Sequence, residues 1–306
     1  MERWVLTAVW ATLPLTAGGA VSDAGAHWPT APAVVAAALC WAAWAVALLA
    51  VVVPRPTGLT VVRLVAPDFA VVAVVVLAAG PATASAGVAV VAAVVAAVLA
   101  ARPPAAAAAV NAVAYGDEVR FPLRVPAALF FGPLPAVRLL VGAGIAAGPL
   151  LLANRQWVAG GICAAVGVPV VWLGCRALHG LSTRFTVLVP AGFVVVDPLT
   201  LADPVLFVRE RIVVLAAVDP DTPAPPGTLD LRLGASAGSV MLLLDRDAEL
   251  FRSTRARRGS EVTHASALTV AVCDRPGLLR AAGSRRIPVR DVTQVAMPPP
   301  SSTSPA

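Results

Sequence analysis

The sequence predicts a membrane protein of two parts: an α-helical transmembrane bundle of about six helices and a small, mainly antiparallel β domain. The composition is 58% hydrophobic and 13% charged, whereas soluble domains carry about 25% charged residues. Apolar runs of bilayer-spanning length occur only before residue 179. After residue 180 the runs shorten to strand length and alternate with Pro, Gly and Asp turns.

Six apolar runs are each near the roughly 20 residues that cross about 30 Å of hydrocarbon. Proline-rich breaks such as Pro54-Arg55-Pro56 and Arg102-Pro103-Pro104 separate them. The fourth run is at the short limit. The expected spans are residues 4–21, 31–53, 61–80, 87–101, 130–152 and 157–178, in a helical domain covering residues 1–179.

The arginines predict the orientation. With a cytoplasmic N-terminus the outer loops carry one arginine, Arg155, and the inner segments carry seven. This asymmetry is typical of inserted membrane proteins, and it places both termini in the cytoplasm. The absence of lysine, with an excess of Ala, Val and Pro, indicates a GC-rich bacterial genome, hence the bacterial inner membrane. The inner arginines are Arg3, Arg55, Arg63, Arg102, Arg120, Arg124 and Arg176.

The first apolar run has an alternative interpretation as a signal peptide cleaved after Ala20, where small residues precede the site. Its flank is weakly charged, with Glu2 beside Arg3, and the run is long for a signal peptide. Cleavage would leave the orientation of the later helices unchanged.

Ionisable residues within the spans are few, and Asp68 and Arg138 are the candidates. Pro67 fits the first turn of a helix, which would put Asp68 at the positive end of the helix dipole near the cytoplasmic interface. Arg138, about two turns into the fifth span, can reach the headgroups. The alternative is a buried Asp68–Arg138 pair, as in a small transporter or channel component.

Small residues on the fifth span, Gly144 and Gly148, form a face that lets helices approach closely. Packing within the chain is the favoured interpretation, and a homodimer seam is the alternative. Between the fourth and fifth spans, residues 114–124 partly alternate in polarity and predict a short extended or hairpin element on the cytoplasmic face.

Residues 180–295 predict a cytoplasmic β-rich domain. The run 234–239 suits a hairpin connection between the strands on either side of it, and a closing helix is expected at 276–282, with proline in its first turn. The tail, residues 296–306, is too poor in apolar residues to pack and is expected to be disordered. The expected strands are residues 183–189, 193–196, 205–208, 212–217, 229–233, 240–244 and 268–272.

Three strings carry a family resemblance: residues 184–187, 190–195 and 209–215, which read RFTV, PAGFVV and RERIVVL. They resemble the opening strands of bacterial pleckstrin-homology-like (PH-like) domains that follow transmembrane helices. The chain is similar to multi-pass membrane proteins of actinobacteria with such a cytoplasmic module. The resemblance implies a β-barrel with a C-terminal helix and a binding rather than catalytic role, and it carries over no site residues.

An arginine cluster lies late in the β-rich domain: Arg252, Arg255, Arg257 and Arg258. Contact with anionic lipid is one interpretation, since each nearby arginine contributes about 1 kcal/mol. The favoured interpretation is a solvated loop, because acidic residues flank the cluster and offset its charge. Nucleic-acid binding is not expected, because no aromatic residues interleave with the arginines.

No catalytic, metal or cofactor motif is recognisable. The four cysteines are dispersed without a CxxC pair, the three histidines are isolated, and a phosphate-binding GxxxxGK loop is absent. We therefore expect no enzyme, no metal and no cofactor. The sequence favours a binding or scaffolding protein held at the lipid bilayer, with other membrane proteins or a second copy as partners. A small transporter or channel component is the alternative.

Overall fold

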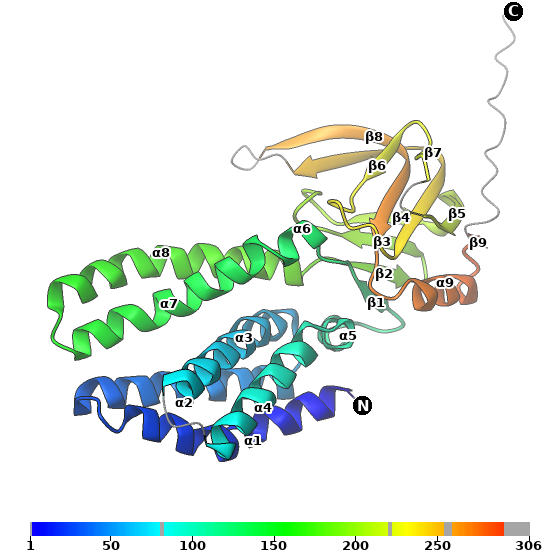
Figure 1. Ribbon diagram of the computed structural model, residues 1–306. Helices are drawn as coiled ribbons and strands as arrows, with labels where there is room; N and C mark the ends of the chain where they lie inside the picture. The colour runs from blue at the N-terminus through cyan, green and yellow to red at the C-terminus, as the bar shows by residue number, and fades with distance from the viewer. Residues whose placement is uncertain (1, 80–82, 220–221, 254–258, 291–306) are drawn as a thin grey trace, which may run out of the picture. The chain divides into compact units, whose positions relative to one another are not determined.

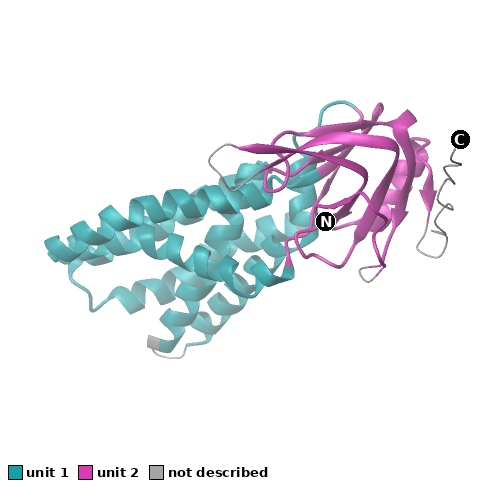
Figure 2. Cartoon of the chain, turned by 90° about the horizontal axis from the view of Figure 1, so that it is seen from above, with its two compact units in different colours: residues 1–116, 127–185 teal, residues 117–126, 186–306 magenta. Residues whose placement is uncertain are grey.

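The computed structural model describes residues 2–79, 83–219, 222–253 and 259–290. The chain forms two compact units, shown in teal and magenta in Figure 2. Unit 1 comprises residues 1–116 and 127–185, and unit 2 comprises residues 117–126 and 186–306. The expected single boundary at residue 179 is therefore wrong in one respect, because residues 117–126 belong to unit 2.

The described part of unit 1 consists of helices and their connections up to Ser182 (Figure 1). Six of its helical segments are long and apolar enough to cross a membrane, which confirms the number predicted. The third begins at Pro56 rather than near residue 61, because Pro56 itself occupies the first turn. The helices are α1 (Glu2–Gly25), α2 (Thr30–Val52), α3 (Pro56–Ala79), α4 (Ala84–Ala101), α5 (Pro103–Asn111), α6 (Ala127–Phe130), α7 (Pro133–Ala153) and α8 (Trp157–Ser182).

A reciprocal pair of indole hydrogen bonds joins α1 to α2. The Trp10 indole N–H donates to the Trp44 carbonyl at 3.0 Å, and the Trp44 indole N–H donates to the Trp10 carbonyl at 2.9 Å. Pro14 lies inside α1, four residues after Trp10, and has no N–H to offer that carbonyl. The Trp44 indole therefore satisfies a backbone acceptor that the proline leaves open, as a membrane interior requires.

Glycine contacts bring α7 and α8 together. A Cβ on Gly167 would lie 2.6 Å from the Gly144 carbonyl oxygen, and one on Gly148 would lie 3.1 Å from the Ala164 Cα. Gly174 approaches Val141 in the same way. The small residues of α7 thus face α8 of the same chain, as the favoured interpretation predicted.

Unit 2 contains two sheets and a helix. One sheet has the strand order β1-β2-β3-β4, and the other has the order β6-β8-β7-β5-β9. The predicted mainly antiparallel β region is confirmed, with two parallel pairs, β5/β9 and β6/β8. The elements are β1 (Val119–Pro122), β2 (Phe185–Val189), β3 (Gly192–Val196), β4 (Val205–Val208), the 3-10 turn η1 (Arg209–Arg211), β5 (Ile212–Ala217), β6 (Thr228–Asp230), β7 (Ser239–Ser253), β8 (Ser260–Ala271), α9 (Arg275–Ser284) and β9 (Val289–Arg290).

Strand β1 comes from the segment before α7, so the α7–α8 hairpin is inserted between the first two strands of a sheet. Leu123, directly after β1, also bridges to Val272 at the end of β8, and the backbone N–H of Arg124 bonds to the Ala271 carbonyl. Phe121 and Leu123 are buried in the core of unit 2. The extended element expected at 114–124 is therefore a strand that completes the β unit.

Two further expectations for unit 2 need correction. Residues 229–233 and 240–244 do not form a hairpin, because β6 pairs with β8 in parallel. Strand β7 continues to Ser253 and pairs along its length with β8, so the two project as the long hairpin in Figure 1. The part of β7 after residue 244 was not predicted because its exposed face carries charged residues. Ala248 and Leu250 are buried on the other face. The expected disordered tail lies outside the described residues.

The inserted hairpin predicts that a fragment beginning at residue 180 will not fold stably, because it lacks Phe121 and Leu123. Removing two buried side chains of this size costs about 5–10 kcal/mol, comparable to the whole stability of about 5–15 kcal/mol of a typical domain. A fragment in which residues 117–126 are joined to residue 184 by a short Gly/Ser linker should fold cooperatively. Thermal unfolding by circular dichroism compares them, and equal stability would contradict this topology.

The glycine contact predicts that Gly167→Ala weakens the α7–α8 hairpin by about 1–3 kcal/mol, because the new methyl group meets backbone that cannot rotate away. Gly161→Ala is the matched control on the same helix, since a Cβ there has no neighbour within 4 Å. Thermal unfolding of the full chain in detergent should separate the two variants. An unchanged unfolding temperature for Gly167→Ala would rule out the close contact.

Candidate functional site

Asp68 lies at the middle of α3, 12 residues after Pro56 and 11 before Ala79. The expected position near the interface is therefore wrong. Pro67 sits inside the helix and not in its first turn, since a membrane helix tolerates an internal proline whose lost bond is compensated nearby. Asp68 is thus a carboxylate in the central part of a candidate membrane span.

The Asp68 side chain rests against α7 where that helix has no side chain. A Cβ on Gly142 would lie 2.6 Å from Asp68 Oδ2 and 3.2 Å from Oδ1. Arg138 lies one turn earlier on the same face of α7. Both Asp68 and Arg138 are half-buried, and their opposite charges attract each other. The structure therefore brings the two candidate residues together across the α3–α7 contact.

Asp68 and Arg138 do not form a direct, hydrogen-bonded ion pair. Asp68 and Arg138 form no mutual hydrogen bond, and the Arg138 Nε is buried without a hydrogen-bond partner. A charge in the centre of a membrane helix costs about 2.5–3.5 kcal/mol, which a nearby opposite charge reduces. The arrangement can hold α3 against the α7–α8 hairpin, with the Arg138 Nε buried and unpaired.

Three further polar contacts lie toward one end of unit 1. The Arg63 guanidinium donates from Nε to the Ala100 carbonyl at 3.1 Å, at the C-terminal end of α4. There the carbonyls lack helical donors and the helix dipole favours a cation. Thr60 Oγ1 lies 3.3 Å from His179 Nδ1, which joins the start of α3 to the end of α8. The Thr60 hydroxyl also donates to the Pro56 carbonyl at 3.1 Å.

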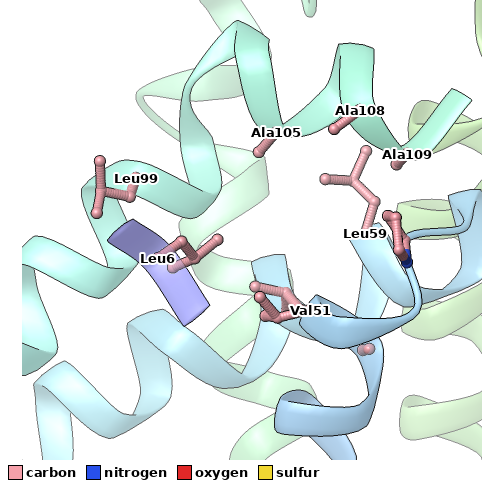
Figure 3. A pocket seen from close by; sticks show the side chains of 10 residues that line it. Leu6, Val51, Leu59, Leu99, Ala105, Ala108 and Ala109 are labelled. Carbon is pink, nitrogen blue, oxygen red and sulfur yellow. The ribbon is translucent and has the colours of Figure 1, made fainter. Parts of the chain in front are cut away.

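An apolar pocket occupies this same end of unit 1, between α1, α2, α3, α4 and α5 (Figure 3). Its ten lining residues all carry hydrocarbon side chains. Leu6, Val51, Leu59 and Leu99 form the larger part of the wall, and alanines of α5 complete it. Neither Asp68 nor Arg138 lines this pocket, so the polar pair and the pocket are separate features of the bundle.

The predicted arginine cluster is only partly visible. Arg252 is exposed on β7 and lies directly opposite Glu261 on β8. Arg255, Arg257 and Arg258 lie outside the described residues. The described part of this hairpin also carries Phe251 opposite Val262, both exposed.

Within the described ranges, no three His, Cys, Asp or Glu side chains gather as a metal site would require. The four cysteines all lie in the described part of the chain, are half-buried and form no disulfide. Comparison of the chain with protein-family models, with curated proteins and with solved structures gave no match.

Sequence reasoning missed Gly142, the apolar pocket and the pairing of β1 with β2. Gly142 lies four residues after Arg138, and this spacing places both residues on one face of α7. The sequence alone could therefore have pointed to Gly142. No sequence pattern predicts the pocket, because alanine is as common on packed helix faces as it is around cavities.

The Asp68–Arg138 attraction predicts non-additive substitutions. Asp68→Asn and Arg138→Gln should each lower stability in detergent, by up to about 3 kcal/mol, because each leaves one charge without its partner. The double variant should lose less than the sum of the two. Asp23→Asn, at an exposed position near the end of α1, is the control. Strictly additive losses in thermal unfolding would show that the two charges do not interact.

Proposed function

We propose that this protein is a membrane-anchored, non-enzymatic binding protein of the bacterial inner membrane. Unit 2 is its cytoplasmic, PH-like binding module, and the partner is an extended polypeptide segment. The observation that carries this proposal is the open edge of strand β4. In the sheet order β1-β2-β3-β4, β4 is the last strand, and no described strand pairs with its outer side.

The backbone of β4 presents hydrogen-bonding groups along this edge. The Arg209 N–H bonds to the Ala191 carbonyl, and the β3/β4 register continues this pairing. Hydrogen-bonded pairs alternate in an antiparallel ladder, so the N–H and C=O groups of Phe207 point toward β3, while those of Leu206 and the N–H of Val208 point outward. The Val208 carbonyl is taken up by η1, because Val208 is its N-cap residue. An added strand would take up the outward-pointing groups.

The side chains along the edge support the same conclusion. Leu206 is 48% exposed and Val208 is 36% exposed, while Phe207 between them is buried. An edge strand with exposed apolar side chains is a template for pairing with another chain. A partner segment would gain backbone hydrogen bonds from the edge and apolar contacts from these two side chains.

The anchoring part of the proposal rests on chain connectivity. The chain passes between the two units three times, near residues 117, 126 and 186. A module appended as a tail would be joined once. Three connections suit a module that must hold a bound partner at the membrane.

The PH-like assignment has support from strand order. The first four strands form one sheet, and β5 to β9 form a second, with helix α9 between β8 and β9. The resemblance of the three sequence strings implies a β-barrel with a C-terminal helix, and two sheets with a helix close to the end of the described chain are compatible with it. A transporter remains the second candidate, favoured by the position of Asp68 at mid-helix.

The open edge predicts crosslinking that depends on the backbone at residue 206. With a photoreactive amino acid at Val208 of the full chain in native membranes, we expect an adduct with another polypeptide. Leu206→Pro should reduce it at least about tenfold, because proline removes an outward N–H and edge strands tolerate proline. Leu206→Thr should retain it, and so should the double variant Asp68→Asn with Arg138→Gln. The proposal would be overturned if the adduct survived Leu206→Pro, or if no adduct formed. It would also be overturned if a photoreactive amino acid placed at Glu249 gave the same adduct equally well.

The orientation predicts which residues impermeant reagents reach. In a cysteine-free background, Gln156→Cys, between α7 and α8, should react with an impermeant maleimide on intact cells. Ser260→Cys, at the start of β8, should react only after the membrane is permeabilised. Labelling of Ser260→Cys on intact cells would place unit 2 on the opposite side.

A further inference from the structure

We propose that the apolar pocket of unit 1 binds the upper part of an acyl chain of an anionic phospholipid, with its headgroup at the arginines beside the pocket. The pocket lies among five helices, and all its lining side chains are hydrocarbon (Figure 3). The proposal concerns a different site from the β4 edge and does not depend on it.

The depth of the pocket matches the region just below lipid headgroups. Leu6 is four residues from the start of α1, Leu59 is three residues from the start of α3, and Leu99 is two residues from the end of α4. Each lies within about 6 Å of a helix end at a rise of about 1.5 Å per residue. An acyl chain entering here would keep its headgroup at the interface.

The size of the pocket selects a narrow occupant. Its volume is about 40 Å³, room for on the order of three water-sized groups. Water is disfavoured because an apolar cavity offers it no hydrogen bonds. A few methylene groups of a longer chain fill such a space, with the rest of the chain running along the bundle in the bilayer.

Alanines create this space. Ala105, Ala108 and Ala109 of α5 face it together with Ala50 of α2. A larger side chain at any of them would fill the pocket from the protein itself.

Arginines at the helix ends give the site its charge. Arg102 lies at the corner between α4 and α5, and Arg55 follows Pro54, which lines the pocket; both are exposed. Arg63 bonds to carbonyls at the same end of α4. Each arginine close to an anionic headgroup contributes roughly fivefold in affinity. This positive rim favours phosphatidylglycerol over a zwitterionic lipid.

The test uses the purified full chain in detergent, with phosphatidylglycerol and phosphatidylcholine as probes. Native mass spectrometry should show one phosphatidylglycerol retained in preference to phosphatidylcholine. Ala108→Leu should reduce retention of both lipids at least about tenfold, whereas Ala42→Leu, at an exposed position of α2, should not. Arg55→Gln with Arg102→Gln should remove the preference, whereas Arg155→Gln, at the other end of the helices, should keep it.

A second measurement covers variants that fail to fold. Phosphatidylglycerol with a photoreactive group near the ester end of its acyl chain should label peptides of α3 and α5 in the unchanged protein. Equal retention of the two lipids, unchanged retention in folded Ala108→Leu, or labelling confined to α7 and α8 would each overturn the proposal.

Discussion

The close glycine contact between α7 and α8 is the constraint on which the two-part structure depends. It holds the two antiparallel helices together, so the chain leaves unit 2 after β1 and returns to it at β2. Strand β1 can then pair with β2 although some 60 residues separate them. In unit 2, β1 supplies buried side chains and its continuation bridges to the end of β8. The β unit therefore depends on a strand that the sequence separates from it by the α7–α8 hairpin.

Three polar contacts in unit 1 each join two helices at a backbone acceptor or a charge. The Trp10–Trp44 pair joins α1 to α2 beside Pro14. Arg63 satisfies the end of α4, and Asp68 meets α7 at a glycine. Because hydrocarbon offers no competing hydrogen bonds, a few such contacts specify which helices neighbour one another. The arginine side of the bundle combines these contacts with the apolar pocket, which gives this end both charge and a space for an acyl chain.

The sequence predicted the features that composition and periodicity encode, namely six spans, a later β region and packing of Gly144 and Gly148 within the chain, although it did not name α8 as the partner helix. It did not predict partnerships between distant segments. Strand β1 carries only four residues, and its assignment depends on β2 and β8. The position of Asp68 was misjudged because proline marks the start of soluble helices but is tolerated inside membrane helices. The outer half of β7 was missed because one face of it is charged.

The central claim is that β1 and the residues after it complete the β unit. An engineered disulfide between Leu123, directly after β1, and Val272, directly after β8, tests this claim most directly. Leu123 and Val272 form an antiparallel bridge in which the flanking residues make the hydrogen bonds, and such pairs have Cα atoms about 4.5 Å apart, within disulfide range. With the native cysteines replaced, Leu123→Cys with Val272→Cys should crosslink in native membranes, so that fragments cut between the two positions stay joined until reduced. Leu123→Cys with Ser284→Cys should not crosslink. Fragments that separate without reductant in the first variant would show that the β unit is not completed across the membrane hairpin.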